Sequence, residues 1–446
     1  MQPWIDRLTS RLGAAPVVAG RPGMGWLLTE CIPVFMWAQV TGALLGESFY
    51  LVTYLTLLGA TAPTLALLPL VAYAGNAGSS LLVFARHHHG NSSSSRRDAQ
   101  WRCVVDTGVG RVFWLGTVLW PLLGLHLGWS PTMLLGGVFA SIFLAQLCHA
   151  AGGASFVVWT QAVVPRELRG RFYVWRNCAS FAATALVVLA MGLVLPKGGA
   201  AHDTPASLLP WLMGIFMVIT LLCLASTWML TRCPVVPDHV HEAPRPPLRE
   251  ALAQAHGYGP LLLFNVFTVG AMAVSMAYLP ALLHARGIGT AVFAAAQGST
   301  FFPAMLGGIF LAGWGLGRLG GRRLLILTAS LLLAADGAFL LLPDVTWLAP
   351  CLVLSGVAKG LWGISLIGRQ QELCPPGDAR FPALMVGLAA VGAMCVAVAL
   401  RLGVPLLEAH VDHVAWTLVA GAAGLRVIAL LVLLLSAPRV DRVSPA

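Results

Sequence analysis

Long apolar runs limit what this sequence can fold into. Segments of about 20 residues with few charges recur from Trp26 to Ser436, and a helix of about 20 apolar residues crosses the ~30 Å hydrocarbon core of a bilayer. Lipid offers the backbone no hydrogen-bond partners, so a spanning chain forms helices or a closed barrel. Barrel strands alternate apolar and polar residues over about ten positions, whereas these runs are longer and continuous. The sequence therefore predicts an all-α polytopic membrane protein.

The charges support this prediction. Only 10% of residues are charged, against roughly 25% in a soluble domain. The net charge of +10 is typical of proteins that bind nucleic acid. The basic residues here, however, cluster in short loops between apolar runs, where they orient membrane proteins. The nine cysteines show no metal-ligand spacing, so we expect neither a disulfide framework nor a zinc site. We expect a lipid bilayer as partner, no nucleic acid and no cofactor.

The apolar runs divide into twelve predicted spans, an even number that places both termini on one side. Only Lys197, Arg286 and Arg401 fall in loops of the opposite side, so the excess of basic residues predicts cytoplasmic termini and an inner, cytoplasmic membrane. The first apolar run is longer than the core of a signal peptide, so we expect it to be retained. The predicted spans are 28–57, 64–85, 104–127, 132–160, 174–195, 208–231, 258–283, 290–315, 324–343, 347–368, 382–404 and 414–436.

A polar stretch divides the chain into two similar parts. Residues 232–256 are rich in proline, histidine and charge, which predicts a cytoplasmic linker between six-helix bundles at 1–231 and 257–446. The parts repeat a pattern after their fourth spans, since PRELRGRF at 165–172 is echoed by PPGDARF at 375–381. Paired halves recur in secondary transporters.

Two loops carry a family resemblance. PRELRGRF at 165–172, followed by Arg176 and Asn177, resembles the P-E-x-x-R-G-R-[YF]…R-N signature of many major facilitator superfamily transporters. GWGLGRLGGRR at 313–323 resembles that family's G-x-x-x-D-R-x-G-R-R turn. The resemblance implies two pseudo-symmetric six-helix bundles and a secondary active transporter that moves a small solute by alternating access. The family's acidic turn residue is Gly317 here, so this turn lacks the acid that helps to hold one closed state in the family.

The basic turns carry the predicted gating residues, and two interpretations remain open for them. Their side chains can hydrogen-bond the last carbonyls of neighbouring helices and complement the negative end of the helix dipole. They can also be markers of the cytoplasmic side alone. The residues are Arg169, Gly170, Arg171, Arg318 and Arg322.

Ionisable residues inside predicted spans are functional hypotheses, because a charge at the bilayer centre is costly. In the fold that the resemblance implies, spans one, four, seven and ten line the central cavity and bring Glu47, His149 and Lys359 to the transport path. A carboxylate and an imidazole can take up and release a proton, so Glu47 and His149 predict proton coupling. Lys359 would either pair with Glu47, as a structural tie or within the transport path, or bind an anionic substrate. His149 can also be a packing residue without a role in transport. Asn265 and Gln297 complete the predicted pathway.

Further charges lie on spans that the resemblance places at the periphery. Asp336 and Arg426 fall on spans nine and twelve, and we expect a buried ion pair between them that holds the second half together. Asp106 and Arg111 fall near the cytoplasmic end of span three.

Two methionines allow a metal interpretation. Met272 and Met276 are four residues apart in span seven and so share a helix face. The spacing resembles the copper-importing branch of the superfamily, in which thioether sulfurs bind Cu(I). Methionine also fills gaps in apolar cores, which is the competing interpretation.

Two other classes of protein are alternatives to a transporter. A membrane enzyme needs a catalytic constellation such as H-E-x-x-H or G-x-S-x-G, and the sequence has none, so we expect no enzyme. A transporter-like fold that serves as a sensor or assembly factor remains an alternative because of Gly317. We expect a monomer, as is common for this fold.

Overall fold

The computed structural model describes the following residues: 24–41, 49–65, 67–89, 96–194, 208–234, 248–255, 257–342, 344–373, 378, 380–408 and 413–436. All regular structure within these ranges is helical, which confirms the predicted all-α class. Ten helical stretches in them are long and apolar enough to cross a membrane. The chain is therefore an integral membrane protein.

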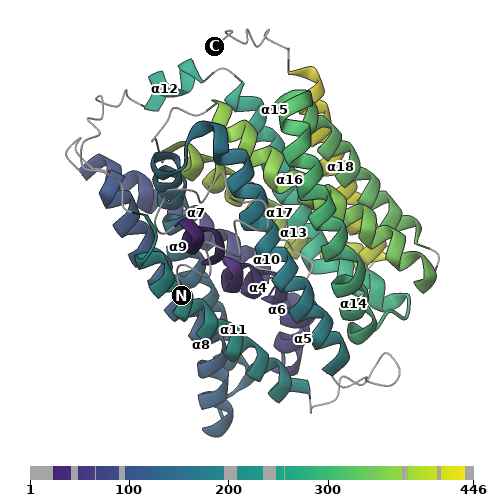
Figure 1. Ribbon diagram of the computed structural model, residues 1–446. Coiled ribbons are helices and arrows are strands. Elements are labelled where there is room, and N and C mark those ends of the chain that lie inside the picture. Colours follow the sequence, from purple (N-terminus) through teal and green to yellow (C-terminus); the bar gives the residue numbers. More distant parts are fainter. Residues whose placement is uncertain are drawn as a thin grey trace.

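The first part of the chain contains both short and long helices. A short helix, α12 (Leu248–Gln254), follows them and lies at one end of the bundle (Figure 1). The preceding helices are α3 (Met24–Thr29), α4 (Ile32–Thr41), α5 (Phe49–Leu57), α6 (Ala62–Leu65), α7 (Leu67–His89), α8 (Arg96–His126), α9 (Pro131–Val163), α10 (Arg166–Val194) and α11 (Leu208–Thr231).

The second part of the chain includes one helix that is interrupted. In α15, Gly320 has φ 75° and ψ 158°, which is not helical, and glycine adopts such a positive φ without steric cost. The interruption falls inside the predicted turn 313–323, so α15 consists of two helical parts. The helices are α13 (Tyr258–Ala285), α14 (Thr290–Ala296), the π-helix η2 (Gln297–Phe301), α15 (Phe302–Leu341), the 3-10 helix η3 (Val345–Trp347), α16 (Leu348–Leu373), α17 (Arg380–Glu408) and α18 (Val414–Leu435).

The first predicted span differs from the sequence expectation. A single helix over 28–57 was expected, but the structure has α3, α4 and α5 in succession, with a turn at Glu30 and Cys31. Pro33 explains the turn, because proline fits the first turn of a helix but interrupts a continuous one. Glu47 lies outside the described residues.

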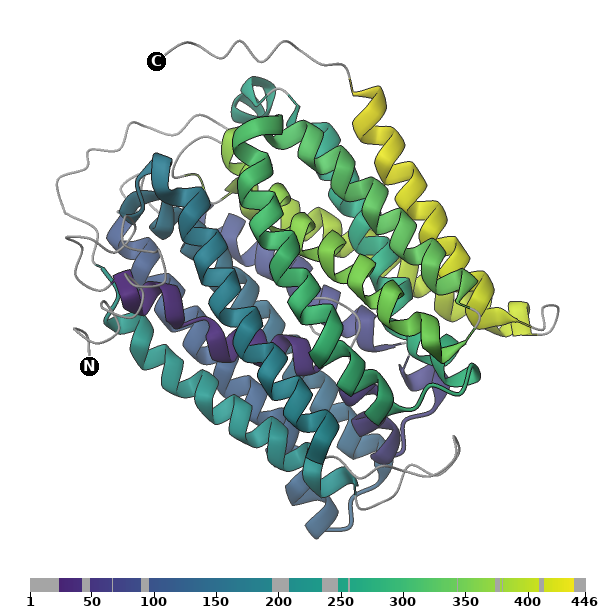
Figure 2. The ribbon, with the colours of Figure 1, turned by 45° about the vertical axis from the view of Figure 1, so that its right-hand side comes forward.

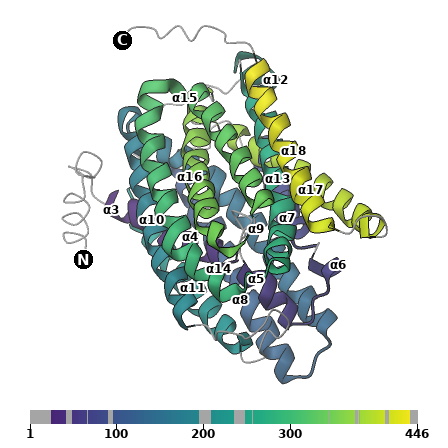
Figure 3. The same cartoon turned by 90° about the vertical axis from the view of Figure 1, so that its right-hand side faces the viewer.

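The helices pack as two groups with contacts between them. In Figures 1 and 2, most of the purple-to-teal helices lie on one side and the green-to-yellow helices on the other, and Figure 3 shows the same bundle from the side. Within the groups α8 packs against α9, and α13 against α18; between them α7 packs against α17, and α10 against α14, η2 and α15. These contacts between the groups join segments far apart in the sequence.

Glycines allow the closest helix contact, between α15 and α16. A Cβ added at Gly360 would lie 2.2 Å from the Met305 carbonyl oxygen, and one at Gly308 would lie 2.4 Å from that of Val357. Lipid tails provide no hydrophobic force between helices, so close backbone packing through small residues contributes strongly to their association.

Gly360→Ala is expected to lower stability by about 1–3 kcal/mol, because the methyl group would overpack the contact with α15. Gly363→Ala is the matched control on α16, since its added Cβ meets nothing within 4 Å. Thermal unfolding in detergent would compare the two variants. Equal melting temperatures would contradict the packing argument.

A buried ion pair joins α15 to α18. The Arg426 Nε donates a hydrogen bond to the Asp336 carboxylate, and both side chains are buried. This is the pair that the sequence predicted between spans nine and twelve. Removing one partner would leave an uncompensated charge, whereas replacing both by apolar residues would not.

Arg426→Met is expected to cost about 3–5 kcal/mol of stability, because it leaves Asp336 charged and unpaired in an apolar setting. The double variant Asp336→Leu/Arg426→Met is expected to recover most of that loss. Thermal and denaturant unfolding in detergent would measure both. A double variant no more stable than Arg426→Met would show that the pair is not the reason for the loss.

Candidate functional site

Three charged side chains meet inside the first group of helices. Glu30, at the turn between α3 and α4, is 2% exposed. Its Oε2 lies 3.4 Å from the Arg111 Nη2, and its Oε1 accepts a hydrogen bond from the Arg176 Nη2. One buried carboxylate therefore bridges two guanidinium groups from α8 and α10.

Further contacts hold both arginines in place. Arg111 lies at the centre of α8, is 1% exposed, and donates from Nη1 to the Thr227 Oγ1 on α11 at 3.0 Å. The Arg176 guanidinium lies 4.3 Å from the centre of the Phe156 ring on α9, a cation–π distance. The cluster thus connects the α3–α4 turn to α8, α9, α10 and α11.

Small residues bring α8 and α9 together at this depth. A Cβ added at Gly110 would lie 3.0 Å from the Ala145 carbonyl oxygen, and one at Gly152 would lie 2.4 Å from the Thr107 Oγ1. The close approach places the centre of α8 beside His149.

His149 on α9 belongs to the same site. Its ring lies 5.1 Å from the Trp114 ring, and its Nδ1 is buried with no hydrogen-bond partner among the described residues. An imidazole nitrogen without a partner can accept or donate a proton when a ligand or water arrives. His149 therefore adds a titratable group to the charged cluster.

The cluster surrounds a cavity of about 160 Å³, which we call the charged cavity. Gly153 on α9 is exposed there, and a Cβ added to it would meet nothing within 4 Å, so the cavity is open on this side. The lining residues are Glu30, Cys31, Val34, Phe35, Cys103, Thr107, Arg111, His149, Gly152, Gly153, Phe156, Arg176 and Leu230.

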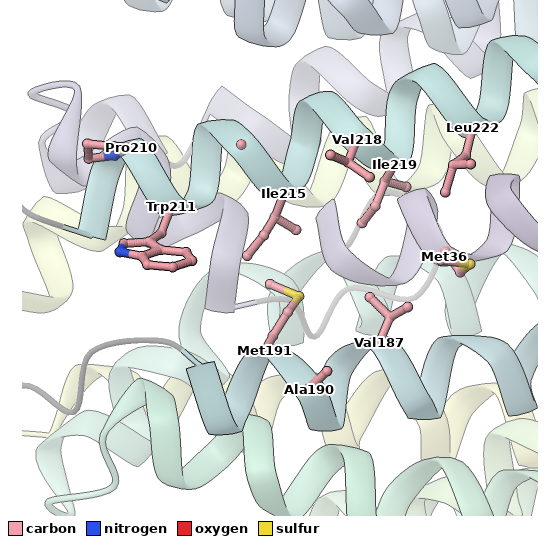
Figure 4. A pocket seen from close by; sticks show the side chains of 11 residues that line it. Met36, Val187, Ala190, Met191, Pro210, Trp211, Ile215, Val218, Ile219 and Leu222 are labelled. Carbon is pink, nitrogen blue, oxygen red and sulfur yellow. The ribbon is translucent and has the colours of Figure 1, made fainter.

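A second, apolar groove lies between α4, α10 and α11, with a volume of about 640 Å³. Figure 4 shows Trp211 and Ile215 of α11 and Met191 of α10 turned towards one another. None of the described residues that line this groove is charged, so their chemistry matches hydrocarbon rather than a polar solute. Its lining residues are Met36, Val187, Ala190, Met191, Pro210, Trp211, Gly214, Ile215, Val218, Ile219 and Leu222.

The remaining predicted pathway residues lie on the second group of helices. Lys359 on α16 is buried, with its Nζ 5.5 Å from the centre of the Phe301 ring. Gln297 is buried at the start of η2, and the Asn265 Oδ1 on α13 is buried with no partner within the described part of the chain. None of the three lines the charged cavity, so the structure does not bring them together with His149.

The basic turn after α9 ties two helices together. The Arg169 Nε donates to the Val164 carbonyl at 3.1 Å, and its Nη2 donates to the Gln161 carbonyl at 2.7 Å. These are the helix-terminal carbonyls to which such a turn was expected to bind. Arg171 is exposed, and Gly170 lies in the first turns of α10.

The turn within α15 makes a similar tie. The Arg322 Nη2 donates to the Leu433 carbonyl near the end of α18 at 3.0 Å, and the Arg318 guanidinium lies 4.6 Å from the Trp314 ring centre. A Cβ added at Gly317 would meet nothing within 4 Å. The missing acid of the family signature therefore leaves free space at this position.

The metal interpretation receives no support from the described residues. Met272 is buried in α13, and the Met276 side chain lies outside the described part. Among the residues that the structure describes, no group of three or more His, Cys, Asp or Glu is placed to hold a metal ion. The copper interpretation stays a prediction.

The charged cavity was only partly anticipated. His149 was predicted, but Glu30 was not, and Arg176 was noted only as part of a motif. Arg111 was expected near the end of span three, whereas α8 begins earlier than that span and places Arg111 at its centre. The missed signal was a charge inside the first apolar run, at Glu30, just before Pro33.

Comparisons with known proteins agree on the architecture. A sequence model described as Major Facilitator Superfamily matches residues 101–400, whereas no curated protein sequence matches the chain. Among solved structures, FucP in the outward conformation has 14% identity and a TM-score of 0.59, covering 92% of this chain and 98% of FucP. The xylose transporter XylE from E. coli, partially occluded and inward open, has 14% identity and a TM-score of 0.59, with 91% and 97% coverage. A bacterial homologue of the iron transporter ferroportin has 13% identity and a TM-score of 0.59, with 93% and 99% coverage.

Arg169→Gln is expected to lower stability by about 1.5–3 kcal/mol, because it removes charge-assisted hydrogen bonds to the last carbonyls of α9. Arg171→Gln is the control, since that side chain is exposed two residues away. Thermal unfolding of both in detergent would measure the difference. If Arg171→Gln lowers stability as much as Arg169→Gln does, the loss comes from the missing positive charge and not from the hydrogen bonds of Arg169 to α9.

Proposed function

We propose that this chain, which belongs to the Major Facilitator Superfamily, is a secondary active transporter that moves a small solute across the cytoplasmic membrane by alternating access. Members of this family are transporters rather than enzymes. FucP and XylE, whose folds it shares, are described as fucose and xylose transporters. At such low identity they support the fold and the class of activity, but not the cargo.

The proposal includes the twelve-span plan. It counts α3 to α5 as one span and divides α14 to α15 into two spans at Gly320. Residues 1–231 and 257–446 then form two six-helix bundles, joined by the linker at 232–256, with both termini in the cytoplasm. The protein works as a monomer on this proposal.

The observation that carries the proposal is the charged cavity. Each charged group at the bilayer centre costs at least about 2.5–3.5 kcal/mol on insertion scales, so such groups are retained for stability or for function. Glu30, Arg111 and Arg176 surround an open space together with His149. A purely structural ion pair has no need of a cavity.

The same residues support proton coupling as part of the proposal. His149 has an unpartnered ring nitrogen, and Glu30 is a carboxylate in direct contact with two cations. Both side chains can exchange protons as access to the cavity alternates. Glu47 remains a second candidate acid on the first span.

His149→Gln is expected to abolish uphill accumulation driven by a proton gradient, because it removes a titratable group from the cavity, while exchange of the same solute without a gradient persists. The measurement is uptake by the purified protein in proteoliposomes, over a panel of sugars, nucleosides, amino acids and organic acids. Wild-type protein that moves none of them, yet binds a protein partner tightly, would favour a sensor or assembly factor instead.

Alternating access requires the contacts between the helix groups to open and close. The Ser80 Oγ on α7 donates to the Ala383 carbonyl on α17 at 2.6 Å. A Cβ at Gly387 would lie 2.7 Å from the Ser80 Cβ, within about an ångström of the ~3.5–4.5 Å between the Cβ atoms of a disulfide. A cross-link at this place would hold α7 against α17.

The double variant Ser80→Cys/Gly387→Cys is expected to lose transport after oxidation, because the cross-link prevents the two helices from separating, and to regain it after reduction. Each single variant, oxidised in the same way, controls for the native cysteines. Full transport by the cross-linked protein would exclude an opening between α7 and α17.

A further inference from the structure

We propose that the charged cavity binds a small organic carboxylate between Arg111 and Arg176, and that Glu30 is an internal competitor that yields this position when it takes up a proton. This inference rests on the proposed function and names its substrate class and coupling step. It assigns to the cavity a ligand of opposite charge to its arginines.

The arginines already display the geometry that a carboxylate needs. One Nη2 from each guanidinium is directed to a different oxygen of the same Glu30 carboxylate. Charge-assisted contacts of this kind are the strong form of hydrogen bond, and guanidinium groups match carboxylates well. A substrate carboxylate in this place would find two donors already aligned.

Donors are also left unused. The Nε atoms of Arg111 and Arg176 are buried and have no hydrogen-bond partner among the described residues, and neither does the Nδ1 of His149. Buried polar atoms without partners are costly. All three belong to side chains that line the cavity.

The charge balance favours an anion. Among the described residues that line the cavity, one carboxylate faces two guanidinium groups, all three buried or mostly buried, which leaves a net positive charge. An excess buried charge is unfavourable unless it is paired. Loss of the Glu30 charge would raise the excess from one positive charge to two, and a bound carboxylate returns it to one.

The same balance couples the anion to a proton. When Glu30 is ionised, it occupies the donors that the substrate needs. When Glu30 binds a proton, its negative charge is lost and both guanidinium groups become available, so one proton enters with one carboxylate. No covalent bond changes, and the proton leaves Glu30 when the substrate departs.

The other groups near Glu30 do not change the conclusion that proton uptake by Glu30 favours carboxylate binding. Buried thiols in apolar surroundings are uncharged near neutral pH, and Asp106 on α8 does not line the cavity and has an interaction of its own. The titratable and charged groups around Glu30 are Cys31 beside it, Cys103 and Arg111 on α8, His149 on α9, Arg176 on α10, Cys223 on α11 and Cys233 just after α11.

Cavity size limits the ligand. The volume of about 160 Å³ corresponds to roughly five water molecules at ~30 Å³ each, which suits a carboxylate of a few carbons. Val34, Phe35 and Leu230 supply apolar walls for its aliphatic part. Acetate, pyruvate and lactate are therefore the probes to use.

The first test measures ligand binding to the purified full chain in detergent. Thermal shift is the readout, at a mildly acidic pH and at a neutral pH. Acetate, pyruvate or lactate is expected to raise the melting temperature, and more so at acidic pH, whereas acetamide and lactamide, which are neutral, should not. Nitrate and phosphate separate a carboxylate site from a general oxyanion site. Binding of the amides, or of the inorganic ions alone, would overturn the inference.

Variants locate the site and the proton. Glu30→Gln is expected to bind the carboxylate at neutral pH at least as tightly as the wild type does at acidic pH, with a much weaker pH dependence because only His149 still titrates in the cavity. Arg176→Gln should weaken binding at least tenfold at both values. An unchanged pH dependence in Glu30→Gln would refute the competitor role.

A steric pair keeps the test decisive if a charge variant fails to fold. Gly153→Leu is expected to block binding by entering the cavity, while Gly136→Leu on the same helix should bind normally, since added Cβ atoms at both sites meet nothing within 4 Å. Equal binding by both would place the ligand elsewhere. Proteoliposomes that transport a neutral solute but bind no carboxylate would refute this inference and leave the proposed transport standing.

Discussion

A bilayer cannot hydrogen-bond a backbone, and the rest of this structure depends on that constraint. Every described span is helical because only a helix satisfies its own peptide groups in lipid. The same lack of water makes each buried charge expensive, so the few charges inside the membrane are found in contact with partners. Glu30 with Arg111 and Arg176, and Asp336 with Arg426, are the two clearest cases.

These two clusters show how similar residues serve different ends. Asp336 and Arg426 join two helices of the second group, and neither lines the charged cavity. Glu30 meets two arginines beside an open space and a histidine. Both clusters are ion pairs buried among apolar helices. The Glu30 cluster differs from the Asp336–Arg426 pair in its unequal number of positive and negative charges and in the space beside it for a ligand.

Much of the fold was predictable from the sequence because lipid restricts a spanning chain to a few structures that satisfy their own backbone hydrogen bonds. Apolar length predicted most helices, and the basic turns predicted the contacts of Arg169 with helix-terminal carbonyls. The sequence predicted less of the site, because Glu30, Arg111 and Arg176 come from segments widely separated in the chain. Their meeting depends on the turn at Glu30 and Cys31, just before Pro33, and on glycines between α8 and α9, which composition and span length do not reveal.

The turn between α3 and α4 has an electrostatic consequence. Glu30 lies two residues before Ile32, the first residue of α4, and the unpaired amides at the start of a helix carry a positive partial charge equivalent to roughly half an elementary charge. Backbone dipoles thus add to the two guanidinium groups in stabilising an anion at this point. The contribution of the helix dipole differs from that of an arginine, because no exchange of a single side chain removes it. It persists as long as a new helix begins after the turn at Glu30.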